Sequence, residues 1–134
     1  MTKTDEKKLV QYWSTLSEHD WEVMRTLYKG KLFAQALFFL HLSLEKLIKS
    51  QIVKESGGHA PFSHDLPYLV GKTSLEVPEQ IVEQLRTITS FNMEARYPDE
   101  KMGFYKKADK KYTSEWIESG TRIKLWLKSQ FAKK

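Results

Sequence analysis

Residues 31–55 predict a helix that is apolar around most of its circumference. Apolar side chains recur there at helical spacing and form two adjacent stripes, which contain only two strongly polar residues. The stripes are Phe33, Leu37, Leu40, Leu44 and Leu47, and then Phe38, His41, Glu45, Ile48 and Ile52. A helix with so wide an apolar surface needs neighbours on most of its sides. We therefore expect this helix to lie at the centre of a helical bundle.

Three further segments carry one apolar stripe each and predict the helices around this centre. The first runs from Leu9 to Leu27 and is expected to stop at Gly30, the second opens at Pro78–Glu79, and the third covers Trp116 to Phe131. Proline is tolerated in a first helical turn, and an acid is favourable there. The expected fold is all-α, a single domain over residues 1–134 with four long helices in an antiparallel up-and-down bundle.

The connecting segments add one short helix and one long loop to this expectation. Gly57–Gly58 closes the central helix, and residues 65–72 form a short helix that begins at its aspartate. Residues 97–112 are rich in Lys, Asp and Gly without a clear period, so we interpret them as a mobile loop. Thr113 or Ser114 then caps the last helix. In that helix, Gly120 is expected to let a neighbouring helix approach closely.

Composition excludes several classes of protein and site. The 134 residues include no cysteine, which rules out disulfides, thiolate catalysis and cysteine-bound zinc and is compatible with a cytoplasmic location. No apolar run approaches the roughly 20 residues of a membrane span. The first residues lack the hydrophobic segment of a secretory signal. The net charge of +5 permits contact with a nucleic acid or another acidic partner.

Five polar residues in apolar surroundings are the candidate site. His41 and Glu45 are one turn apart in the central helix, Asn92 and Arg96 are one turn apart near the end of the third long helix, and Asp20 lies within the first stripe. Burying such groups without partners costs about 1–3 kcal/mol each. Helix lengths and connections place all five at one level of the bundle, so we predict that they converge in a polar cleft, with Arg96 turned inward.

Other interpretations of these polar residues remain open. Charged side chains between helices often pair with one another and fix the helix register without any chemistry. His59 and His64, five residues apart, would hold a metal ion only with further ligands that the sequence does not identify. His64–Asp65–Leu66 instead favours a cap for the short helix. We expect neither a metal nor another cofactor.

Four segments resemble the HEPN family of small helical domains, which occur in prokaryotes and are often encoded beside minimal nucleotidyltransferases. They are Asp20, residues 39–49, His64–Asp65–Leu66 and residues 95–100 (Ala-Arg-Tyr-Pro-Asp-Glu), so the similarity extends over most of the chain. The resemblance implies a bundle of four main helices plus a short one. It also implies a homodimer formed through the long helices.

The chain departs from the RNA-cleaving members of that family. Those members carry an Arg followed by four to six residues and a His, whereas here no histidine follows His64. The string Arg96-Tyr97-Pro98 resembles a subgroup without the catalytic pair, for which the family implies a binding or regulatory role. The implied partner is a minimal nucleotidyltransferase in a toxin–antitoxin-like pair, with a nucleotide or RNA phosphate held near Arg96. The alternative is a metal-independent ribonuclease in which His41 replaces the missing histidine.

Overall fold

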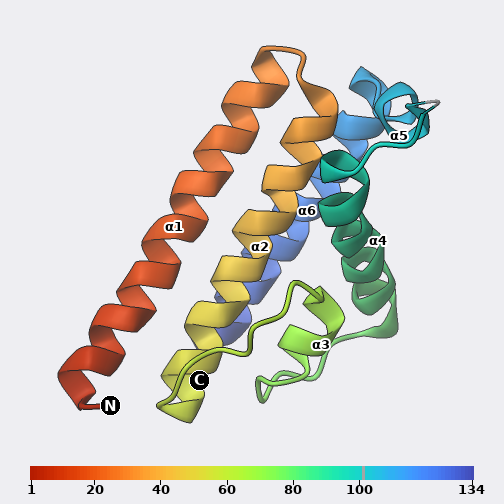
Figure 1. Ribbon diagram of the computed structural model, residues 1–134. Helices are drawn as coiled ribbons and strands as arrows, with labels where there is room; N and C mark the ends of the chain where they lie inside the picture. The colour runs from red at the N-terminus through yellow and green to blue at the C-terminus, as the bar shows by residue number, and fades with distance from the viewer. Residues whose placement is uncertain (101) are drawn as a thin grey trace.

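The computed structural model describes residues 1–100 and 102–134 and consists of four long and two short helices in that part of the chain (Figure 1). The helices are α1 (Lys3–Lys29), α2 (Phe33–Ser56), α3 (Leu66–Val70), α4 (Glu79–Arg96), α5 (Gly103–Lys107) and α6 (Lys110–Phe131). The four long helices run alternately up and down, and both termini lie at the same end. The predicted all-α bundle is confirmed, with one additional short helix.

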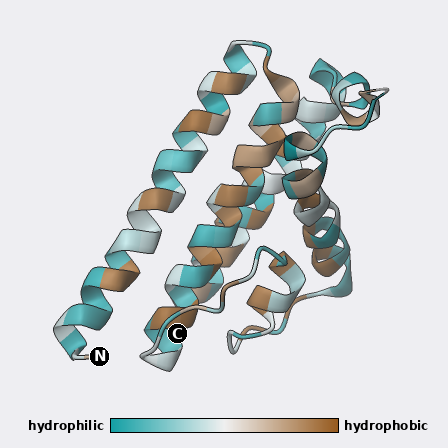
Figure 2. Cartoon of the chain, in the orientation of Figure 1, coloured by the Kyte–Doolittle hydropathy of each residue, from teal (hydrophilic) through white to brown (hydrophobic). Residues whose placement is uncertain are grey.

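Helix α2 is the centre of the bundle, as its two apolar stripes predict. It contacts all five other helices, while α1 on one side and α4 and α6 on the others enclose it (Figure 1). Apolar residues follow α2 along its length, whereas α1 is more hydrophilic on the face shown in Figure 2. None of the helices in the described part of the chain is both long enough and apolar enough to cross a bilayer.

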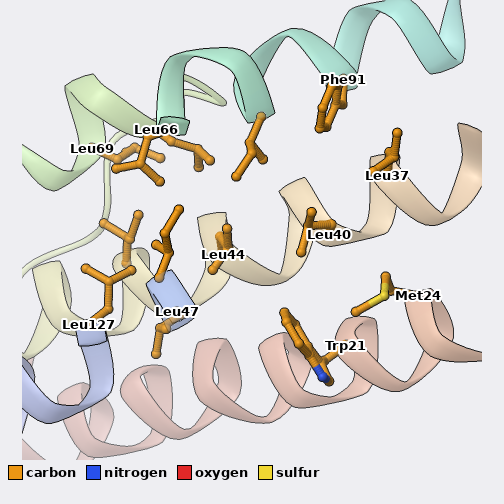
Figure 3. Packing of buried hydrophobic residues seen from close by; sticks show 14 of the residues in the cluster. Trp21, Met24, Leu37, Leu40, Leu44, Leu47, Leu66, Leu69, Phe91 and Leu127 are labelled. Atoms are coloured by element: carbon orange, nitrogen blue, oxygen red, sulfur yellow. The ribbon is translucent and has the colours of Figure 1, made fainter. Parts of the chain in front are cut away.

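The core is formed where the other helices direct large side chains at α2. Figure 3 shows Trp21 and Met24 of α1, Phe91 of α4 and Leu127 of α6 around the leucines of α2. All of these are buried. Gly120 of α6 packs directly on α2, because a Cβ at that position would lie 2.6 Å from Cδ1 of Leu40. The predicted close approach at Gly120 is thus present.

The helix ends follow local chemistry. Thr2 caps α1 in a capping box with Asp5, which is an efficient way to satisfy the first free amides. Gly57 ends α2 in the left-handed conformation, at φ 71°, where glycine has no steric penalty. Lys31 also adopts a positive φ, so α2 begins at Phe33, two residues later than expected.

The prediction of a mobile loop over residues 97–112 is wrong for the residues of this range that the structure describes. Lys101 is not among the described residues. The segment contains α5, which is too short to produce a recognisable period. Phe104 packs against Phe91 with ring centroids 5.6 Å apart, and the Tyr105 hydroxyl donates to the Ala95 carbonyl at 2.7 Å. These contacts fix the segment on α4.

The start of α6 also differs from the sequence-based expectation. Asp109 is its cap, in place of the expected Thr113 or Ser114, and accepts a hydrogen bond from the Tyr112 amide at 2.8 Å, so the helix begins four or five residues earlier than expected. Thr113 lies inside the helix and is fully buried. The sequence does not single out Asp109 as a cap, because it lies in a run of charged residues without apolar periodicity. An aspartate can cap as well as serine or threonine.

Candidate ligand-binding site at the central helix

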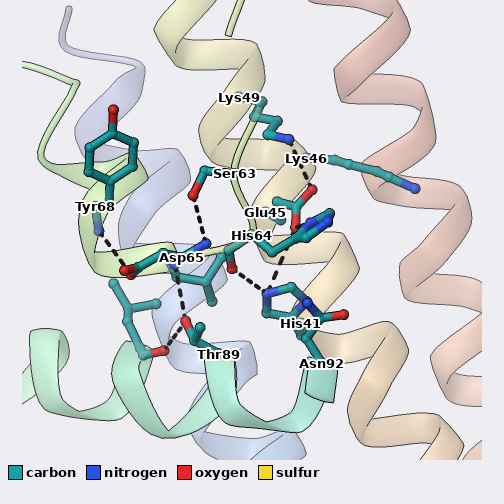
Figure 4. A network of polar contacts seen from close by, with 12 residues as sticks. His41, Glu45, Lys46, Lys49, Ser63, His64, Asp65, Tyr68, Thr89 and Asn92 are labelled. Atoms are coloured by element: carbon teal, nitrogen blue, oxygen red, sulfur yellow. Dashed lines mark hydrogen bonds and ion pairs between the residues drawn. The ribbon is translucent and has the colours of Figure 1, made fainter. Parts of the chain in front are cut away.

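Glu45 of α2 is a buried carboxylate held by two nitrogen donors (Figure 4). Lys49, one turn later, lies 3.1 Å from Oε2, and Nδ1 of His64 lies 2.8 Å from Oε1. His64 belongs to the segment between α2 and α3, which runs back along α2 after Gly57 (Figure 1). The Lys49 ammonium also lies over the Trp13 ring, 5.2 Å from its centroid. Glu45 therefore connects α2 to that segment, while its partner Lys49 contacts α1.

His41 is completely buried beside this carboxylate. Its Nε2 lies 2.8 Å from the backbone carbonyl of His64, which can only accept, so Nε2 carries the hydrogen. Nδ1 is buried without a partner among the described residues. Burial lowers the pKa of His41; the hydrogen bond to His64 and the charge of Glu45 oppose this effect, and the charges of His64 and Arg96 add to it. His41 is thus a neutral structural group that no substrate can reach.

Acidification is expected to destabilise the fold through His41. Because its pKa in the folded protein is below the value of about 6.5 for an unfolded chain, the unfolded state binds more protons as the pH falls through this range. The free energy of unfolding should therefore decrease between about pH 7 and pH 5. In His41→Gln, the amide can still donate to His64 without titrating, so urea melts should show a flatter pH profile. An identical profile would contradict this assignment.

Asp20 does not join the cluster, which corrects part of the predicted cleft. Its carboxylate pairs with Lys46 of α2 at 2.5 Å, across the interface between α1 and α2. Lys46 follows Glu45 directly, and successive helical residues point about 100° apart. Figure 4 shows the Lys46 side chain directed away from Glu45. Asp20 and Lys46 therefore form a separate ion pair that sets the register of the first hairpin.

Arg96 also departs from its expected position, because it remains exposed instead of turning inward. Its Nε donates to the backbone carbonyl of Asn92 at 3.1 Å. The guanidinium lies 5.7 Å from the ring centroid of Phe38 on α2 and 5.3 Å from that of Tyr97. Asn92 itself is buried, and its side chain points toward His41 in Figure 4. Arg96 is thus at the outer edge of the predicted cluster.

The exposed edge of the cluster presents a cation without an acidic partner in the described part of the chain. Among residues 1–100 and 102–134, no carboxylate lies within ion-pair distance of Arg96. Its Nε is occupied and its guanidinium lies beside two aromatic rings, while neither terminal Nη group makes a hydrogen bond among the described residues. A planar guanidinium of this kind holds phosphate or carboxylate through two parallel hydrogen bonds. In the same part of the chain, no group of three or more metal-ligating side chains could hold a metal ion.

The sequence interpretation missed the role of His64. Asp65 alone caps α3, accepting a hydrogen bond from the Tyr68 amide at 3.2 Å, while His64 binds Glu45 through its side chain and His41 through its carbonyl. A signal for this role was available, because a carboxylate in an apolar helix needs donors beyond its own helix. The glycine pair after α2 allows the chain to return and supply one.

Two comparisons with known proteins agree with this fold. The model of the HEPN domain family matches residues 10–130. The crystal structure of ST0689, an archaeal HEPN homologue, is similar with a TM-score of 0.71 and 22% sequence identity, over 91% of this chain and 97% of that chain. At this identity the likeness concerns the fold alone. A search of curated proteins gave no match.

Proposed function

Because this chain belongs to the HEPN domain family, we propose that it is a non-catalytic binding and regulatory module that holds a nucleotide or RNA phosphate at Arg96. The observation that carries the proposal is the exposed guanidinium, oriented by Phe38, Tyr97 and the Asn92 carbonyl and free of any acidic partner among the described residues. The net charge of +5 favours the approach of a phosphate-bearing ligand.

The Arg96 side chain is already oriented before a ligand binds, which supports this role. A free arginine side chain loses rotamer entropy when it closes on a ligand. Here the Nε hydrogen bond and the two aromatic contacts have already restricted the guanidinium. Tyr97 is itself well exposed and offers a face on which a nucleobase can stack. Together they provide a phosphate contact next to an aromatic surface.

The non-catalytic part of the proposal rests on the missing proton-transfer group. The ribonuclease alternative requires His41 as the base, but this imidazole has no exposed surface and uses Nε2 within the protein. A general base has to come within hydrogen-bond reach of the proton that it removes. Structured and single-stranded RNA should therefore be degraded no faster by the protein than by an Arg96→Ala/His41→Ala control. Cleavage seen only with the unmodified protein would favour the ribonuclease.

The proposal also includes a partner, which the resemblance to the family suggests. We propose a homodimer that associates with a minimal nucleotidyltransferase in a toxin–antitoxin-like pair. Light scattering tests the dimer, and co-purification with such a nucleotidyltransferase tests the pair. A dimer that binds no nucleotide in thermal-shift measurements and no nucleotidyltransferase would instead indicate a purely structural assembly unit.

Replacing Arg96 with alanine is expected to weaken nucleotide binding about tenfold to a hundredfold, because hydrogen bonds to charged groups contribute about 1.5–3 kcal/mol. Its melting temperature and helical circular dichroism should hardly change, since the side chain is exposed. Isothermal titration with a mononucleotide measures the affinity. Arg86→Ala is the matched control, because Arg86 is exposed on the same helix but paired with Glu83.

Two outcomes would count against the assignment of Arg96. Equal affinities of the Arg96→Ala and Arg86→Ala proteins would show that the phosphate binds elsewhere. A loss of several kcal/mol in the free energy of unfolding of Arg96→Ala would mark Arg96 as a structural group.

A further inference from the structure

A second exposed pair of residues, His64 and Phe62, repeats the arrangement of Arg96 and Tyr97. Phe62 is fully exposed, and its ring centroid lies 6.3 Å from that of His64. The His64 side chain is about half exposed, and its Nδ1 is occupied by Glu45. The other ring nitrogen, Nε2, makes no hydrogen bond within the described residues. Each pair thus combines an exposed aromatic ring with a nitrogen-containing side chain, one nitrogen of which is hydrogen-bonded within the protein.

Both pairs contact the same stripe of α2, the one that includes Phe38, His41 and Glu45. Arg96 lies over Phe38, and His64 is bonded to Glu45, seven residues later. With a rise of 1.5 Å per residue, the two anchoring positions are about 10 Å apart along the helix. His41 occupies the stripe between them, and its pKa is lowered mainly by burial, with smaller electrostatic contributions from nearby His64 and Arg96. The two pairs therefore flank one short stretch of the surface.

We infer that this surface binds a single-stranded oligonucleotide, with one phosphate on Arg96, a second polar contact on Nε2 of His64, and bases stacked on Tyr97 and Phe62. The inference rests on the proposed function and extends it from a mononucleotide to a chain. About 10 Å corresponds to roughly three stacked nucleotides at 3.4 Å each. Unpaired bases are required, because duplex stacking would hide their faces from the two rings.

Charge and exposure favour a nucleic acid over a protein segment here. Arg96 is a cation that complements a phosphate, and Nε2 of His64, whose Nδ1 hydrogen is given to Glu45, can accept a hydrogen bond from a base amine or a ribose hydroxyl. Phe62 belongs neither to the hydrophobic core nor to the apolar residues packed against it, and its ring lies beside the imidazole of His64. An isolated exposed ring beside a polar nitrogen suits base stacking better than a buried interface core.

The test uses fluorescence anisotropy of the full chain with labelled mononucleotides, single-stranded hexanucleotides of RNA and of DNA, and a duplex. The unmodified protein should bind either hexanucleotide more tightly than the mononucleotide or the duplex. Phe62→Ala should weaken hexanucleotide binding at least about fivefold, and His64→Asn roughly threefold to tenfold. Asparagine keeps a donor near the position of Nδ1, so the contact with Glu45 is preserved while Nε2 is removed. Neither variant should change mononucleotide binding at Arg96.

Controls separate this inference from the proposed function. Leu125→Ala removes an exposed apolar side chain on α6 and should leave every affinity unchanged. If Arg96→Ala weakens all binding while Phe62→Ala and His64→Asn behave like the unmodified protein, the second contact is overturned and the phosphate site stands. If Arg96→Ala has no effect on the mononucleotide, the proposed function fails first. Equal affinity for duplex and single strand also overturns the inference.

Discussion

Replacement of Glu45 by alanine is expected to lower the free energy of unfolding by about 3–5 kcal/mol, the usual cost of removing one member of a buried ion pair. Lys49 is almost fully buried and would lose the carboxylate that lies 3.1 Å from its ammonium. The Nδ1 donor of His64 would also lose its acceptor. Urea denaturation followed by circular dichroism measures the effect.

A second substitution tests whether this loss in the free energy of unfolding comes from the Lys49 ammonium that is left buried without a partner. In Glu45→Ala/Lys49→Met, no buried ammonium remains, and methionine can fill the space against Trp13. The double variant should therefore recover a large part of the stability lost in Glu45→Ala. A loss below about 1 kcal/mol in Glu45→Ala, as at an exposed ion pair, would show that Glu45 is not the buried centre of the cluster.

Replacement of Leu40 by alanine is expected to lower the free energy of unfolding by about 2–5 kcal/mol, because it leaves a cavity where α2 meets α6. Leu40 is fully buried, and its side chain lies over Gly120. In the unmodified protein, Gly120→Ala should also be destabilising, because the added methyl would lie 2.6 Å from Cδ1 of Leu40. Overpacking of this kind costs about 1–3 kcal/mol, more than the helix propensity that alanine adds.

The two substitutions should not be additive. Once Leu40 is alanine, the methyl of Gly120→Ala enters open space and partly fills the cavity, so the same change should become neutral or stabilising. A double-mutant cycle from urea melts measures this coupling. Additive effects would mean that the two helices do not approach as closely at Gly120 as the structure shows.

The sequence predicts the bundle well because its apolar residues recur at helical spacing. The two stripes of α2 place it at the centre, and Gly57, Asp65 and Pro78 mark ends and starts that the structure confirms within one or two residues. The family resemblance is confirmed by a match over residues 10–130. The sequence does not predict helix α5, because five residues are too few to show a helical period. Phe104 and Tyr105 hold this helix in place through their contacts with α4.

The candidate site was less predictable, because side-chain direction depends on neighbours that no period describes. Helical angles place Arg96 toward the core, but it is the last residue of α4, and its long side chain lies across Phe38 instead of entering the bundle. Asp20 lies at the expected level of the bundle, but its carboxylate pairs with Lys46, which lies on a different face of α2 from Glu45. His64 joins the cluster through a loop conformation that spacing alone does not predict.

The proposed function depends on the Arg96 guanidinium as a phosphate-binding group that its aromatic and backbone contacts hold in position. Nuclear magnetic resonance of the arginine side-chain Nε–Hε groups during a titration with a mononucleotide tests it most directly, with Arg96→Lys used to assign the signal. Binding of a phosphate at Arg96 should give a saturating shift of the Arg96 resonance while that of Arg86 stays in place. A ligand that saturates the protein without moving the Arg96 resonance would contradict it.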